Sequence, residues 1–213
     1  AATVMNGSSN NTLTVENGAT FDIYEMAAPV LWSLIINDNG RYYARQGANN
    51  KNFWAGPITL NGRAITDANS GYYSTLSGVI SGTGSVVKIG LGTIYFSNTN
   101  NLYTGTTTIT NGTLWATVPG ALPGYATTGR VTLAYNGNLT VYSGLDGTNG
   151  WTSDQINTLI AAATFSNDSA QVTIDTTYAS VPGLANIQKG FGLNVQGTNI
   201  VTLSGVNSNS TAL

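Results

Sequence analysis

The sequence contains neither cysteine nor histidine. Without cysteine, the chain has no disulfides, no thiolate nucleophiles and no thiolate metal ligands. Without histidine, it has no imidazole for acid–base catalysis near neutral pH, and metal sites built from Cys and His are excluded. The commonest catalytic and metal-binding side chains are therefore missing.

Charged side chains are also scarce, at 8% of residues with a formal net charge of −2. No basic surplus is available to neutralise phosphates, so nucleic acid is not an expected partner. Hydrophobic residues make up 41% of the chain, which indicates a real core. Surface polarity must then come from Asn, Thr, Ser and Gly. This composition is typical of exported bacterial surface proteins, and we expect a secreted or cell-surface location.

No apolar run approaches the ~20 residues that a helix needs to cross a bilayer, so no membrane span is predicted. The chain begins Ala1-Ala2-Thr3 and shows no signal peptide. We expect either that a leader has been removed or that the chain is part of a longer polypeptide.

Short β-prone runs dominate the chain, and most of them alternate as a strand with one buried face does. Asn-Gly dipeptides recur between the runs, and because Asn and Gly tolerate positive φ, each pair can turn the chain sharply. They also suit the hairpins of an antiparallel sandwich, which is the alternative interpretation. Strands this short, each followed by a turn, favour a solenoid whose coils stack by parallel pairing. The clearest runs are Thr12–Val15, Trp32–Ile36, Ile58–Leu60, Val86–Ile89, Thr93–Phe96, Thr106–Thr110, Val131–Tyr135, Leu139–Tyr142, Val172–Ile174 and Ile200–Leu203.

One stretch, about 151–165, has a different period. Ile156, Leu159, Ile160 and Ala163 fall at i, i+3, i+4 and i+7, which predicts one amphipathic helix. Thr152 and Gln155 can form a capping box, and Trp151 and Ile156 occupy the positions of a hydrophobic staple. We expect this helix to pack against the side of the solenoid through its apolar stripe, with Trp151 buried.

The segment 80–114 resembles the autotransporter-associated β-strand repeat, also called the passenger-associated transport repeat. That family follows roughly the pattern G-x-G-x-L-x-K-x-G-x-G-T-L-x-L-S-x-x-N-x-Y-T-G-x-T-x-V-x-x-G-T-L. A truncated second copy is predicted near 190–213, with Gly192 aligned to Gly84, and the whole of 1–213 is expected to form one domain. The matching positions in the first copy are Gly82, Gly84, Lys88, Gly90, Gly92, Thr93, Ser97, Asn101, Tyr103, Thr104, Gly105, Thr107, Gly112, Thr113 and Leu114.

The resemblance implies a right-handed parallel β-helix on a bacterial surface or in a secreted product. Independently of the family, alternating apolar residues can fill the interior of such coils, and glycines suit the places where backbones approach closely. Thr and Asn on the turns can form ladders along the axis, each bonding to its equivalent one coil away. We therefore expect an all-β, right-handed parallel β-helix with one short external α-helix.

The acidic residues do not form an obvious catalytic pair. Only Asp22, Glu25 and Asp38 lie near one another in sequence, and a glycosidase needs two carboxylates across one cleft. No calcium-binding repeat, G-x-S-x-G elbow or P-loop is present. We expect no enzyme activity, no cofactor and no metal, and the leading hypothesis is a structural stalk or filament unit.

The stretch 21–54 supports a second hypothesis, an adhesin module. Aromatic faces beside hydrogen-bonding side chains can bind a glycan or a surface receptor. The alternative is that these rings only pack in or over the solenoid. The residues assigned to this surface are Tyr24, Trp32, Arg41, Tyr42, Tyr43, Arg45 and Trp54.

The two ends of the chain suggest self-association. The second repeat copy stops at Leu213, and Thr3-Val4-Met5-Asn6-Gly7 resembles Thr108–Gly112, the piece that would complete it. An open solenoid end invites another strand, and a head-to-tail contact propagates into a fibre. We expect identical copies to stack axially, or repeats to follow one another in tandem. The contacts would involve Thr3, Val4, Asn6, Ile200, Leu203 and Leu213.

Overall fold

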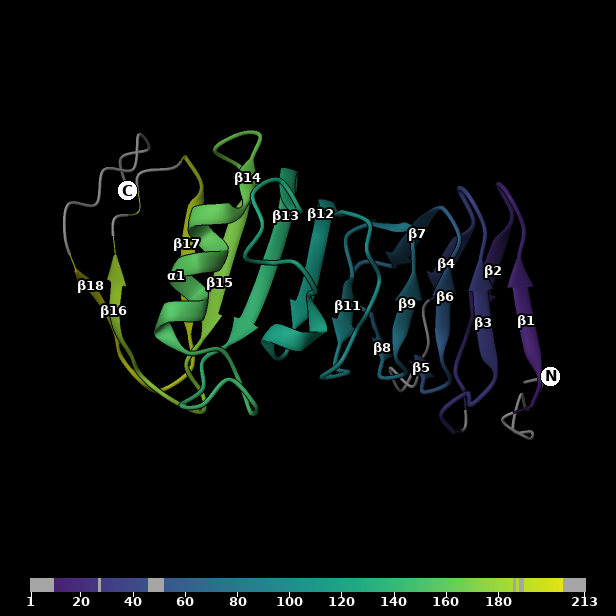
Figure 1. Ribbon diagram of the computed structural model, residues 1–213, viewed down its shortest axis with the longest axis horizontal. Helices are drawn as coiled ribbons and strands as arrows, with labels where there is room; N and C mark the ends of the chain where they lie inside the picture. Colours follow the sequence, from purple (N-terminus) through teal and green to yellow (C-terminus); the bar gives the residue numbers. More distant parts are fainter. Residues whose placement is uncertain (1–9, 27, 46–51, 186, 188–189, 205–213) are drawn as a thin grey trace.

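The chain forms a rod of stacked parallel strands, seen in a computed structural model that describes residues 10–26, 28–45, 52–185, 187 and 190–204 (Figure 1). Strands make up 49% of it and helical residues 7%, in about eight coils with a single α-helix. The strands run across the long axis, with β1 at one end of the rod and β16 to β18 at the other (Figure 1). The predicted all-β parallel solenoid is confirmed, and the antiparallel sandwich is excluded because every strand pair among the described residues is parallel.

The first face of the rod is a four-stranded sheet in the order β1-β3-β6-β9. Its register places Thr12 opposite Ser33, then Leu34 opposite Ile58, then Ile58 opposite Ile80, so successive coils take 21, 24 and 22 residues. We call this stack of strands, one from each coil, the first file. Its strands are β1 (Thr12–Val15), β3 (Ser33–Ile36), β6 (Ile58–Leu60) and β9 (Ile80–Gly82).

The other two faces form one bent, twelve-stranded sheet. The second file comprises β2 (Thr20–Ile23), β4 (Arg41–Ala44), β7 (Arg63–Ala68) and β10 (Ser85–Ile89). The third file comprises β5 (Asn52–Trp54), β8 (Tyr73–Leu76) and β11 (Thr93–Phe96).

Two long strands, β12 (Thr107–Ala116) and β13 (Val131–Tyr142), join these files. The first part of β12 pairs with β10 and its last part with β11. The corner between them is at Gly112, whose φ is +61° and whose Cβ, if present, would lie 2.6 Å from the Gly92 carbonyl oxygen. Glycine therefore allows one strand to serve both files. The remaining elements are η1 (Pro119–Ala121), β14 (Thr164–Phe165), β15 (Gln171–Asp175), β16 (Val181–Ala185), β17 (Gly192–Gln196) and β18 (Val201–Ser204).

The second repeat copy does not keep the alignment predicted for it. β17 pairs with β15, and β15 pairs with residues 138–142 of β13. That part of β13 pairs with the third-file end of β12. β17 therefore lies in the third file, with β11. The alignment of Gly192 to Gly84 had matched β17 with β10, which lies in the second file. The coil-length insertions between the two copies shift the phase, because pairing register depends on the stacked neighbour and not on sequence likeness.

Apolar side chains fill the interior in one contiguous core. β3, β4 and β11 each show strict alternation of partly exposed and buried residues, as a two-residue strand period requires. The largest fully buried side chains include Trp54, Trp151, Tyr42, Tyr103, Phe96 and Phe191.

Polar side chains form the expected ladders along the axis. Asn61 donates through its side-chain amide to Asn37 at 2.9 Å, and Asn37 donates in the same way to Glu16 at 2.7 Å. Asn101 is buried and connects three coils, because its Oδ1 accepts from the Ile80 amide at 2.8 Å and its Nδ2 donates to the Ala121 carbonyl at 2.9 Å. This arrangement satisfies backbone groups where the first file has no regular strand.

The helix α1 (Ser153–Ala162) forms where the period predicted it. The capping box of Thr152 and Gln155 is present, Ile156, Leu159 and Ile160 are buried, and Trp151 is enclosed with its indole donating to the Ala116 carbonyl at 2.9 Å.

The helix is an integral part of its coil. It lies between the third-file part of β13 and β14, where the chain order requires a first-file segment. Asn157 holds it against β16 through the Gly183 carbonyl and the Ala185 amide. α1 thus replaces a strand of the first file, which explains why its whole apolar stripe belongs to the core.

Alkaline pH should unfold this protein through its buried tyrosines. Burial raises the pKa of Tyr42 and Tyr103 well above the ordinary value of 10.0, and hydrogen bonds to Ser74 and Thr107 offset this only in part. The unfolded chain loses these protons near pH 10 while the folded chain keeps them. The contribution of the two tyrosines to the free energy of unfolding is therefore fully present below about pH 10 and is lost as the pH rises above it. We expect tyrosinate absorbance and loss of β circular dichroism to develop together.

Tyr42→Phe should make the decline of unfolding free energy with pH shallower, because one proton fewer is coupled to unfolding. Tyr24→Phe, which changes an exposed ring, is the matched control. Equal slopes for Tyr42→Phe and the parent protein would refute the role assigned to buried phenols.

Candidate functional site

Two residues assigned to the predicted aromatic surface are in the core. Tyr42 and Trp54 are both 0% exposed. Their rings pack edge to face at 6.3 Å, and Phe21 lies 5.7 Å from Trp54. The assignment of Tyr42 and Trp54 to a ligand-binding surface was wrong, because their positions in β4 and β5 point into the coil and no ligand can reach them.

The other five residues assigned to that surface are at least partly exposed, but the two arginines among them form ion pairs within the solenoid. Arg41 forms an ion pair with the buried Asp67 and lies 4.6 Å from the centre of the Tyr43 ring. Arg45 pairs with Asp22. Tyr24 is 51% exposed and Trp32 is half-buried, so only part of the predicted surface is accessible.

The residues predicted to mediate assembly are only partly described. Thr3, Val4, Asn6 and Leu213 lie outside the described residues. Ile200 lies directly before β18 and is 69% exposed, and Leu203 lies in β18 and is 52% exposed.

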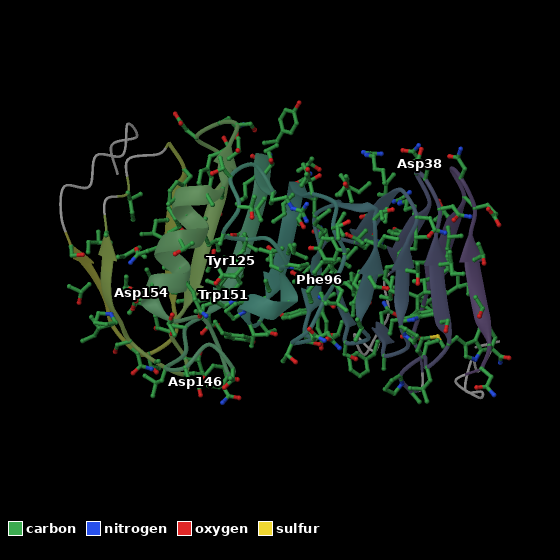
Figure 2. The ribbon with its side chains drawn as sticks, in the orientation of Figure 1. Asp38, Phe96, Tyr125, Asp146, Trp151 and Asp154 are labelled. Carbon is green, nitrogen blue, oxygen red and sulfur yellow. The ribbon has the colours of Figure 1, made fainter. Side chains whose placement is uncertain are left out.

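Carboxylates do not converge on one place. Asp38 and Asp146 lie at opposite edges of the rod, and Asp154 lies on α1 (Figure 2). Asp175 is engaged by Thr177 and by Gln196, which donates at 2.9 Å. Among the described residues, no three acidic side chains come together as metal ligands.

One buried lysine is used inside the fold. The ammonium of Lys88 donates to the carbonyls of Ile89, Gly90 and Asn111 at 2.7, 2.9 and 3.1 Å. Burial lowers its pKa to about 8, while the charge of Asp67 acts in the opposite direction. Lys88 joins the corners of two successive coils, which gives the motif lysine a structural role.

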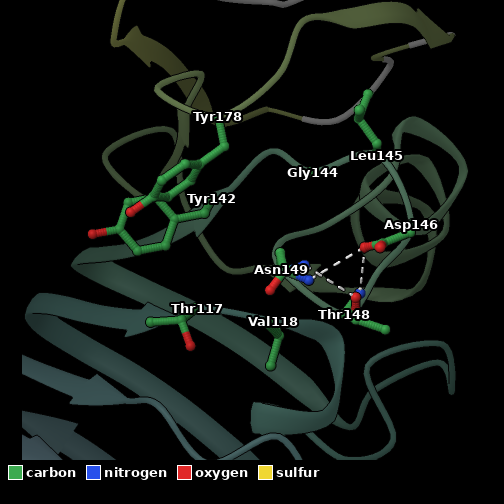
Figure 3. Close-up of a pocket in the computed structure, with 9 residues that line it drawn as sticks. All are labelled: Thr117, Val118, Tyr142, Gly144, Leu145, Asp146, Thr148, Asn149 and Tyr178. Atoms are coloured by element: carbon green, nitrogen blue, oxygen red, sulfur yellow. Dashed lines mark hydrogen bonds between the residues drawn. The ribbon is translucent and has the colours of Figure 1, made fainter.

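A hollow lies beside the coil that contains α1. It has a volume of about 630 Å³ (Figure 3). The loop 144–150 forms one wall, and the rings of Tyr142 and Tyr178 form the other (Figure 3). The residues lining it are Thr117, Val118, Tyr142, Gly144, Leu145, Asp146, Thr148, Asn149 and Tyr178.

The loop wall is organised by Asp146. One oxygen of its carboxylate accepts from the amides of Thr148 and Asn149 at 2.9 and 3.3 Å. The hydrogen bonds from Thr148 and Asn149 hold the pKa of this carboxyl below its ordinary value of 3.8, so Asp146 is ionised at neutral pH. The turn thus presents a fixed acceptor to the cavity.

The aromatic wall is the end of a longer ladder of rings on the outer face of the third file, which we call the aromatic ladder. Neighbouring centroids along it lie 4.9 to 5.4 Å apart. Its members are Tyr73, Tyr95, Trp115, Tyr142 and Tyr178.

Neither the ladder nor the cavity was predicted from the sequence. A signal was present, since Tyr73, Tyr95 and Trp115 are separated by 22 and 20 residues, about one coil. The coil insertions before Tyr142 and Tyr178 break that spacing. Burial contributes most to a raised pKa of about 12 at Tyr95, as expected for a ring covered on both sides.

Comparison with known proteins gives no match to a family, to a curated protein or to a solved structure. The resemblance to the autotransporter-associated repeat stays a prediction. In the part of the chain that the structure describes, no helix is long and apolar enough to cross a membrane.

Proposed function

We propose that this chain is a structural β-solenoid of a bacterial surface, a rod that serves as a stalk or as a head-to-tail filament unit. The observation that carries this proposal is that the buried charged and amide side chains bind other parts of the solenoid. Lys88, Asn101 and the Arg41–Asp67 pair all connect one coil to another, and all satisfy groups of the solenoid itself. Polar chemistry directed at the fold supports a mechanical role rather than catalysis.

Axial contact with a second copy is supported by the coil that contains β17 and β18. Val195, Ile200 and Leu203 expose apolar side chains there, and β18 pairs with β16. A solenoid coil is complementary to another parallel coil, because backbone pairing and apolar stacking repeat along the axis. A contact of this kind is heterologous and propagates without closing.

The composition supports the proposed location. Few charges, no cysteine and abundant Asn, Thr, Ser and Gly suit an exported protein whose surface is kept soluble by uncharged polar groups. Antibodies raised against the purified protein should label intact cells of the source bacterium. Label that appears only after lysis would contradict the surface location.

The assembly proposal predicts concentration-dependent, rod-like association of the purified protein. Sedimentation velocity and electron microscopy should show lengthening rods, and Ile200→Lys with Leu203→Lys should reduce their length, because charge is placed on the exposed apolar side chains of this coil. Leu91→Lys, at an exposed site away from the ends, is the matched control. A parent protein that stays monomeric at high concentration would argue against the filament unit. If the purified protein released fragments from polysaccharides incubated with it, this activity would argue against a purely structural role.

A further inference from the structure

The cavity beside α1 has the two kinds of wall that a sugar ring requires. Tyr142 and Tyr178 lie 5.2 Å apart and pack edge to face at 69°, and Tyr178 is 63% exposed. A tyrosine ring offers an apolar face and a polar hydroxyl, which suits a binding surface that is partly exposed to solvent. A pyranose ring offers the matching surface, with C–H bonds on its face and hydroxyls at its rim.

The opposite wall supplies hydrogen-bonding groups. Asp146, Thr148 and Asn149 face the aromatic wall across the cavity (Figure 3). The Asp146 carboxylate only accepts hydrogen bonds and is held in place by its turn, so it can accept a hydrogen bond donated by a ligand hydroxyl. A few fixed polar groups in a largely apolar cavity are what orient a small ligand.

The charge of the lining selects against anions. Asp146 is the ionisable acid of the lining, and no Lys or Arg is among the lining residues. A phosphate, sulfate or uronate group would meet a carboxylate with no compensating cation, which disfavours binding. A neutral ligand rich in hydroxyls fits this lining.

The aromatic ladder extends the site along the rod. Tyr95 and Trp115 stack at 4.9 Å with an interplanar angle of 20°, and Trp115 lies 5.0 Å from Tyr142. The row of rings leads from the cavity across several coils. A ligand with several sugar units could place one in the cavity and rest the others on this row.

We propose that the cavity and the aromatic ladder bind a neutral oligosaccharide. Tyr178 provides the platform, and Asp146 and Asn149 bind the hydroxyls of the unit in the cavity. This binding site is independent of the proposed structural role, since a rod can display it without assembling and assembly does not require a ligand.

The test is titration of the whole chain with cellohexaose, maltohexaose, mannohexaose and chitohexaose, followed by tryptophan fluorescence and calorimetry. At least one should bind. Tyr178→Ala should weaken its affinity about tenfold, by loss of the aromatic contact. Asp146→Asn, which keeps the side-chain shape, should also weaken binding, and both variants should retain the parent's circular dichroism.

Tyr24→Ala is the matched control, because it removes an exposed tyrosine of the stretch 21–54 far from the cavity in the sequence. Its affinity should equal that of the parent. Failure of all four oligosaccharides to bind would overturn the proposal. Binding that survives Tyr178→Ala but is lost in Tyr24→Ala would overturn it as well, and would place the ligand on the 21–54 surface instead.

Discussion

Gly78→Ala should disrupt the stacking of the N-terminal coils. Gly78 lies between β8 and β9, directly over Gly56, which occupies the same corner one coil earlier. A Cβ on Gly78 would overlap the Gly56 carbonyl oxygen and lie 2.5 Å from the carbonyl carbon, and a Cβ on Gly56 would overlap the Trp32 carbonyl oxygen in the same way. Both obstacles are backbone atoms, so no side chain can move aside.

The expected loss in the free energy of unfolding is about 4 kcal/mol or more, because the coils must separate to admit one methyl group. Urea unfolding followed by circular dichroism measures it. Gly183→Ala is the matched control. Its Cβ would meet only the Ser204 hydroxyl, at 3.5 Å, so its stability should stay within about 0.5 kcal/mol of the parent or rise slightly. If Gly78→Ala were as stable as Gly183→Ala, the close approach at this corner would not exist.

Ile156→Asp should unfold the C-terminal part of the rod. Ile156 is fully buried on the stripe of α1. The substitution removes a core side chain and places a carboxylate in the core with no cation provided for it, at a cost of about 4 kcal/mol. Because α1 replaces a strand of its coil, its loss also exposes the neighbouring β16.

The damage should remain local, since each solenoid coil contacts only its neighbours. Hydrogen exchange should show lost amide protection from β14 to β18 and retained protection from β1 to β11. Thr158→Asp places the same group on the exposed side of α1 and is the control, with stability close to that of the parent. Uniform loss of protection along the whole rod would show that the coils unfold as one unit.

The sequence by itself determined the type of fold. Runs of alternating residues with a turn after each run indicated an all-β fold, because local period and turn chemistry act within a few residues. The shortness of the strands and the repeat pattern favoured a parallel solenoid over an antiparallel sandwich, although the Asn-Gly turns suit both. The helix was equally predictable, since the stripe of Ile156, Leu159 and Ile160 and the capping box of Thr152 are local features.

Tertiary structure decided which aromatic rings face outward. In β4 the two neighbouring tyrosines point to opposite sides, so Tyr42 is in the core while Tyr43 is partly exposed, and only closure of the coil decides between them. The cavity depends on the stacking of several coils. Its walls come from Thr117, from the loop 144–150 and from Tyr178, which become neighbours only when successive coils stack with insertions of unequal length. Coil stacking places these residues together through register, and register is a property of paired strands that no single segment carries.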